Sequence, residues 1–156
     1  MKQFVAAALL VSASSAMAAS GQFASLVSYE YVFSKPSTAT GTTSGVLNTS
    51  IEYTFPRSLS LYGGATFILR DSYESSLNFG ARLYTSTPLF HWGQNKPIWS
   101  YVGVGTYLVD NLAYFPEAGL RIATSDNTRM DVFFKVYNSS DTAYDRLATL
   151  GVGLTF

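Results

Sequence analysis

The sequence predicts an all-β protein, an eight-stranded antiparallel up-and-down transmembrane β-barrel. Three observations predict this fold class. Eight segments alternate between apolar and other residues with a period of two, which is typical of strands with two different faces. The chain begins like an exported protein, and after that start no apolar run approaches the ~20 residues that a transmembrane helix needs. The last strand ends on an aromatic residue of its apolar face, without a polar tail.

The N-terminus has the three parts of a secretory signal peptide. A basic start at Lys2 precedes an apolar run over residues 4–11 and an Ala-Met-Ala sequence that ends at Ala18. The apolar run is too short to cross a membrane as a helix. The alternative is a buried N-terminal helix of the folded domain. We expect residues 1–18 to be the signal peptide and residues 19–156 to form a single barrel domain.

The composition of the chain excludes several classes of function. The chain has 10 basic and 10 acidic side chains, and loss of Lys2 with the signal peptide leaves 9 against 10, a net charge near −1. Nucleic-acid binding needs a basic face, so we expect no nucleic-acid partner. Cysteine is absent, which excludes a disulfide framework and a thiolate metal site. An exported domain without disulfides needs another source of stability, and a closed barrel in a membrane provides one.

The eight alternating segments are separated by polar stretches or turn signals. They cover residues 23–33, 46–55, 59–69, 76–84, 98–109, 114–123, 130–137 and 149–156. In the first, Tyr29 and Tyr31 lie on the apolar face and Glu30 on the other. The fifth is the least regular, and we place Gly103 and Gly105 on its inner face beside bulky partners. Segments of about nine to eleven residues suit a tilted strand that crosses the hydrocarbon of a bilayer.

An even number of strands brings both chain ends to one side of the membrane. For an exported chain inserted from the periplasm, that side is the periplasm. The connections expected to face outside are residues 34–44, 70–75, 110–112 and 138–145, and those expected to face the periplasm are residues 56–58, 85–97 and 124–129. The connection from Thr85 to Pro97 is long for a periplasmic turn and contains Leu89, Phe90 and Trp92. Its role is not evident from the sequence.

Seven charged residues fall on the face opposite the apolar one. They are Glu30, Glu52, Arg82, Glu117, Arg121, Asp131 and Lys135. On the lipid face near the bilayer midplane an Arg or Lys costs about 2–4 kcal/mol. Inside an eight-stranded barrel, which is just wide enough for side chains to fill it, the same charges can pair. Four acids and three bases therefore predict an ion-pair network that plugs the barrel interior.

Two other interpretations remain open at this point. The inward charges could line a narrow channel, although eight strands leave little room for water. The apolar faces could instead meet in the core of a soluble periplasmic or secreted β-barrel that binds a small apolar ligand. Periodicity alone does not separate these alternatives.

Aromatic residues cluster toward the two ends of the predicted strands. Those near the expected periplasmic rim are Tyr53, Phe55, Trp99 and Phe156, and those toward the other rim are Tyr31, Phe33 and Phe67. Aromatic rings prefer the two interfaces of a bilayer, so this distribution favours a membrane girdle. The alternative is that aromatic residues are simply common in strands.

The C-terminal segment resembles the β-signal of bacterial outer-membrane barrels. Thr149, Gly151, Leu154 and Phe156 supply its polar residue, its glycine two positions on, its apolar residue and its terminal aromatic. In architecture the mature chain is similar to the small eight-stranded OmpA/OmpX-like group. The resemblance implies location in the outer membrane of a Gram-negative bacterium and contact with lipid and lipopolysaccharide. It also implies recognition by the barrel-assembly machinery and a structural role in envelope integrity or surface interaction. We expect a monomer.

Catalysis and cofactors are not expected. His91 is the only histidine, and no carboxylate lies near it in the sequence to complete a metal site. Some small outer-membrane barrels modify lipids with a His and a Ser on their outer strands or loops, but here His91 falls in a predicted periplasmic turn. Asp141 and Asp145 could hold a divalent cation, although a solvated loop is the simpler interpretation.

Overall fold

A computed structural model describes residues 21–35, 43–56, 58–70, 74–93, 96–108 and 112–156. The expected signal peptide, residues 1–18, lies outside the described residues, as do parts of the connections 34–44, 56–58, 70–75, 85–97 and 110–112. The described residues contain no helix that is long and apolar enough to cross a membrane.

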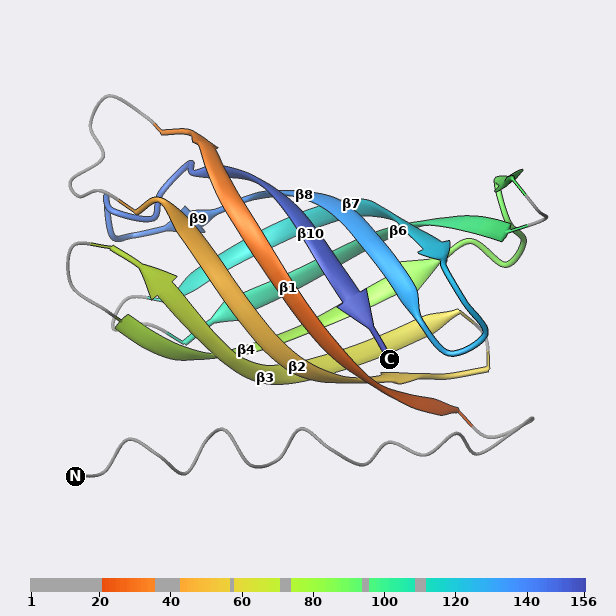
Figure 1. Cartoon of the computed structure of the whole chain (residues 1–156). Coiled ribbons are helices and arrows are strands. Elements are labelled where there is room, and N and C mark those ends of the chain that lie inside the picture. Colours follow the sequence, from red (N-terminus) through yellow and green to blue (C-terminus); the bar gives the residue numbers. More distant parts are fainter. Residues whose placement is uncertain (1–20, 36–42, 57, 71–73, 94–95, 109–111) are drawn as a thin grey trace.

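Eight strands form the wall of the molecule, in agreement with the predicted fold class. They are β1 (Gln22–Ser34), β2 (Gly45–Thr54), β3 (Leu59–Leu69), β4 (Glu74–Tyr84), β6 (Lys96–Tyr107), β7 (Ala113–Ala123), β8 (Arg129–Val136) and β10 (Ala148–Thr155). Each pairs antiparallel with its neighbours in the chain. The first and last strands close the sheet, with Tyr29 opposite Val152. The prediction of a closed, antiparallel up-and-down barrel is therefore confirmed (Figure 1).

The barrel has two ends, which we name by the chain. The terminal end is where β1 begins and β10 ends, and the distal end is the opposite one (Figure 1). At the terminal end Phe156 completes the closure, because its N–H donates to Ser25 O at 2.9 Å and its carbonyl accepts from Ser25 N at 3.0 Å. A tight turn joins β2 to β3 at this end, with Phe55 N donating to Leu59 O at 2.7 Å and Ser58 at a φ of 69°.

Burial alternates along most of each wall strand, and the inside is the polar side. On β10, for example, Thr149 and Thr155 are buried whereas Leu150, Val152 and Leu154 are exposed. Successive side chains of a strand point to opposite faces, so the exposed set forms one apolar outer wall. The pattern is the inverse of that of a soluble sandwich, whose apolar faces meet inside.

Glycines make room for the large inner side chains. A Cβ at Gly105 would stand 2.6 Å from both Phe115 Cζ and the Tyr62 hydroxyl, and one at Gly103 would stand 2.8 Å from Glu117 Oε1. Both glycines therefore lie beside bulky inward partners, as the sequence predicted. In this narrow barrel, a glycine on a neighbouring strand leaves the space that a large inner side chain occupies.

Two short strands add to the predicted eight. β5 (Phe90–Trp92) lies within the long connection from Thr85 to Pro97, where no strand was predicted, and it pairs with the start of β6. β9 (Asn138–Ser139) pairs with the start of β7. The expectation of a solvated loop over residues 138–145 is wrong for its second half, because Ala143 and Tyr144 fold into the distal end and are buried. Apolar side chains there close the barrel, a role that the polar character of the loop concealed.

Candidate functional site

All seven inward charges lie inside the barrel and are almost fully buried. Their exposed fractions are 0% for Glu30, Glu52 and Asp131, 2% for Arg82, 3% for Lys135 and 4% for Glu117 and Arg121. Charges removed from water this completely must be paired and hydrogen-bonded, because an isolated buried ion is very costly. The arrangement of their partners therefore defines the site.

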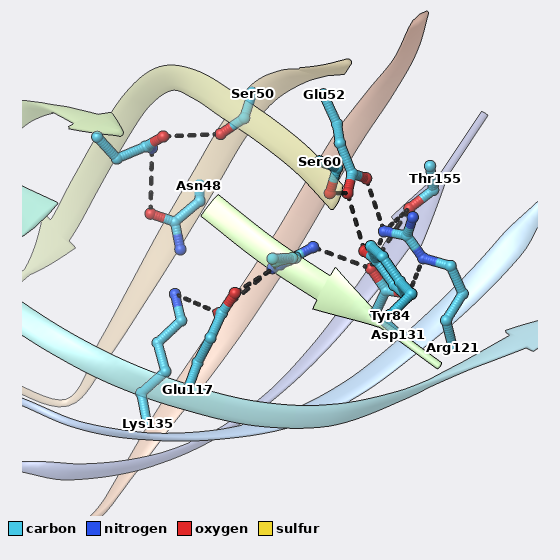
Figure 2. Close-up of polar contacts among 12 residues, drawn as sticks. Asn48, Ser50, Glu52, Ser60, Tyr84, Glu117, Arg121, Asp131, Lys135 and Thr155 are labelled. Carbon is cyan, nitrogen blue, oxygen red and sulfur yellow. Dashed lines mark hydrogen bonds and ion pairs between the residues drawn. The ribbon is translucent and has the colours of Figure 1, made fainter. Parts of the chain in front are cut away.

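Arg121 and Arg82 organise a cluster toward the terminal end. Arg121 donates to Glu52 Oε2 at 2.7 Å from Nη2 and to Asp131 Oδ1 at 2.7 Å from Nε. Arg82 donates to Glu117 Oε1 at 2.5 Å and to Asp131 Oδ2 at 3.3 Å. Asp131 thus joins the two guanidinium groups, and we call these five residues the arginine cluster (Figure 2).

Glu30 is the centre of a second cluster, which we call the Glu30 cluster. Its Oε1 accepts from Lys135 Nζ at 2.6 Å, from Asn48 Nδ2 at 2.7 Å and from the Tyr107 hydroxyl at 2.9 Å. Its Oε2 accepts from Thr149 Oγ1 at 3.1 Å and from the hydroxyl of Tyr137. One cation and four neutral donors surround this carboxylate, which compensates for its loss of water.

The two clusters meet between Lys135 and Glu117. Lys135 Nζ lies 3.8 Å from Glu117 Oε2, while that carboxylate also pairs with Arg82 (Figure 2). The seven side chains are three cations and four anions, and they form one connected network with a formal charge of −1.

Aromatic rings hold the cations in place. The Arg82 guanidinium carbon lies 4.8 Å from the ring centres of both Tyr62 and Tyr101. Arg121 lies 4.7 Å from the ring centre of Tyr84, whose hydroxyl donates to Glu52 Oε1 at 2.8 Å. Cation–π contacts of this kind strengthen when the cation is desolvated.

Uncharged polar residues extend the network, and the sequence analysis did not single them out. Ser50 Oγ donates to Asn78 Oδ1 at 2.8 Å, Asn78 Nδ2 donates to Thr66 Oγ1 at 2.7 Å, and Thr66 donates to Asn48 Oδ1 at 2.6 Å. Their positions in the sequence could have indicated them, since each lies on the inner face of its strand together with a charged residue or a tyrosine.

Little free space remains where the two clusters meet. A cavity of about 10 Å³ lies between the two clusters, lined among others by Tyr62, Asn78, Arg82 and Lys135. That volume admits about one water molecule. The hydroxyl of Tyr62 is buried there without a hydrogen-bond partner.

The distal end is closed by the segment before β10. Ala143, Tyr144 and Leu147 pack with wall residues such as Val32 and Ile68 in one buried apolar cluster. The Tyr144 hydroxyl donates to Glu74 Oε2 at 2.5 Å and accepts from Arg70 Nη1 at 2.9 Å. Burial and the neighbouring Glu74 carboxylate raise the pKa of Tyr144 above its ordinary value, so the phenol remains a donor to Glu74 at pH values where an ordinary tyrosine ionises.

The four residues of the predicted β-signal divide between the two faces of β10. Thr149 points inward to Glu30, and Gly151 lies inside against the ring of Phe133. Leu154 and Phe156 point outward and are 44% and 52% exposed.

Among the other sequence candidates, Asp141 and Asp145 lie in one turn, where the N–H of Asp145 donates to the carbonyl of Asp141 at 2.9 Å. His91 lies exposed on β5, and Asp141 accepts from the backbone N–H of Ala143 at 2.9 Å and so caps a turn. Within the described residues, no group of three His, Cys, Asp or Glu side chains is arranged to hold a metal ion. Comparisons with protein-family models, curated proteins and solved structures found no match to this chain.

Proposed function

We propose that this protein is a structural outer-membrane β-barrel of a Gram-negative bacterium, with a plugged polar interior and no catalytic role. One observation carries the proposal: the outer wall is apolar and exposed while the ions are inside. Leu61, Phe79, Leu83, Val104 and Val152 are each between 47% and 63% exposed.

Energetics support lipid around this wall. Burying a Leu, Val or Phe side chain away from water contributes about 1.5–3 kcal/mol. A soluble monomer would forgo that gain at many wall positions while it places seven charges in its core. In a bilayer the apolar wall is solvated by hydrocarbon, and the antiparallel closure leaves no unpaired sheet edge in it.

The two alternatives are less well supported. A soluble carrier of a small apolar ligand needs an apolar cavity, whereas the interior contains ion pairs and a cavity of only about 10 Å³. A channel needs a continuous aqueous path, and paired charges occupy the position of that path in the arginine cluster.

The predicted signal peptide and the predicted C-terminal β-signal support the same location. An exported chain with such a last strand would be recognised by the barrel-assembly machinery and would contact outer-membrane lipid and lipopolysaccharide. In this role the network stabilises the barrel from inside, because several of its ion pairs link strands that are not neighbours in the sheet. Envelope integrity and surface interaction are the roles that such a barrel would serve as a monomer.

Cell fractionation combined with gel mobility tests the proposal. Full-length protein should be found in the outer-membrane fraction, and unheated samples in detergent should migrate differently from boiled ones. As a matched control, Gly151→Val should abolish the mobility difference, because a Cβ there meets the Phe133 ring. Recovery of the wild-type protein as a soluble periplasmic species without a mobility difference would refute the proposal.

A further inference from the structure

One feature of the terminal end is not explained by the barrel itself. After β4 the chain continues into a hairpin, residues 89–93 and 96–98, which we call the aromatic hairpin. Thr85 N donates to Ser100 O at 2.9 Å, and Leu89 N donates to Ile98 O at 2.8 Å, so β5 continues the line of β4 beside β6. By contrast, tight backbone turns join β2 to β3 and β7 to β8 at this end. The hairpin is the green segment at the terminal end (Figure 1).

Strand register places its two aromatic rings on the outer face. Phe90 pairs with Ile98, and Trp92 pairs with Lys96. Side chains directly opposite each other in a ladder share a face, and Ile98 shares its face of β6 with the exposed Val102. Phe90 is 52% exposed and Trp92 is 64% exposed, so they continue the apolar wall beyond the end of β4.

The base of the hairpin is packed, although its aromatic rings are open. Ile98 lies between Phe90 and Ile122 in the ladder and is only 3% exposed. The Lys96 ammonium donates to Thr124 O at 2.7 Å, which joins the hairpin to the neighbouring turn. The exposed rings are thus presented from an anchored base.

The charges around the rings indicate what contacts them. Residues 85–97 include Lys96 and no Asp or Glu. Exposed Trp and Phe rings beside a cation, without a carboxylate in the same segment, match the boundary between hydrocarbon and phosphate headgroups. The continuity of these rings with the apolar wall puts them at the level where that wall ends.

We propose that the aromatic hairpin inserts Phe90 and Trp92 into the headgroup boundary of the leaflet at the terminal end, with Lys96 near lipid phosphates. This inference rests on the proposed membrane location of the barrel. The contact gives the long connection between β4 and β6 a role. The connection would set how deeply the barrel lies in the membrane at the terminal end.

Tryptophan fluorescence tests this contact, because Trp92 and Trp99 are the only two tryptophans of the chain. Trp99→Phe leaves Trp92 as the single reporter. The variant is refolded into phosphatidylcholine vesicles with and without phosphatidylglycerol, using lipids brominated either near the headgroup or deep in the acyl chain. We expect stronger quenching by the shallow bromines than by the deep ones, and several-fold less iodide quenching than in the unfolded chain.

A wall reporter separates this inference from the proposed function. The triple variant Trp92→Phe, Trp99→Phe, Val152→Trp places the fluorophore on the outer wall of β10, where deep bromines should quench it. If position 152 is quenched but Trp92 remains as open to iodide as in the unfolded chain, the hairpin proposal is wrong and the membrane barrel stands. Trp92 shielded from both iodide and bromine would indicate a protein contact and would also refute it. If position 152 is not quenched either, the membrane location itself fails.

Discussion

Removing the cation of the Glu30 cluster should destabilise the barrel far more than removing its anion. In Lys135→Met the Glu30 carboxylate, 0% exposed, loses the ammonium 2.6 Å away and keeps only neutral donors. Deleting one partner of a buried ion pair costs about 3–5 kcal/mol. The formal charge of the network also changes from −1 to −2, whereas Glu30→Gln changes it to 0 and leaves Lys135 with Glu117 at 3.8 Å.

A double-mutant cycle measures this difference. The free energy of unfolding by urea is followed by tryptophan emission and by gel mobility for the wild type, for Lys135→Met, for Glu30→Gln and for the double variant. The double variant should lose less stability than the sum of the single losses, with a coupling free energy of up to about 3 kcal/mol. Thr155→Val removes a hydroxyl that accepts from Arg121 Nη2 at 3.3 Å, and it serves as a control that should couple weakly to Lys135→Met.

Equal losses in the two single variants, or strict additivity in the double variant, would refute this reasoning. Either result would mean that the Glu30 carboxylate is hydrated or is neutralised without Lys135. The interior would then not be the closed network of ion pairs described above.

Three further predictions concern the wall, the distal end and the interior. Val152→Arg, at an outward position 51% exposed, should destabilise the vesicle-embedded barrel by about 2–4 kcal/mol. Ser86→Arg, in an exposed connection, should change the free energy of unfolding little. Equally small effects of the two variants on unfolding by urea would contradict a lipid-facing wall. Tyr144→Phe should cost about 1 kcal/mol at neutral pH. Because the pKa of Tyr144 is raised in the folded state, the contribution of its phenol to stability is fully present below the ordinary tyrosine pKa. That contribution is lost only as the pH rises through the higher folded pKa. In an alkaline titration followed at the phenolate absorbance, Tyr144→Phe should therefore show one late-titrating group fewer than the wild type. In planar bilayers the wild-type protein should give no sustained conductance, and steady ion currents would contradict the filled interior.

The alternation of apolar and other residues was sufficient to predict the wall strands and their two faces. Around Glu30, for instance, Tyr29 and Tyr31 are outward and exposed at 45% and 58% while the acid is buried, as the period of two indicates. The predicted strand ends differ from the observed ones by at most two residues, because ladder pairing and not residue type decides where a strand ends.

The connections were harder to predict than the strands. β5 was missed because Phe90, His91 and Trp92 make a strand too short to show a period, and it exists only through its pairing with β6. The burial of Tyr144 was missed because most residues of its connection are polar, and only the apolar distal end of the folded barrel buries its ring.

The alternation of residues therefore predicted the eight wall strands and the face on which each inward charge lies. These are local properties, since a period of two acts within a single strand. Which charges pair depends on the folded barrel, because Arg82 meets Glu117 across 35 residues and Lys135 meets Glu30 across 105. Those contacts depend on the heights at which eight tilted strands bring their side chains into one narrow interior, and barrel closure sets these heights for the whole chain at once.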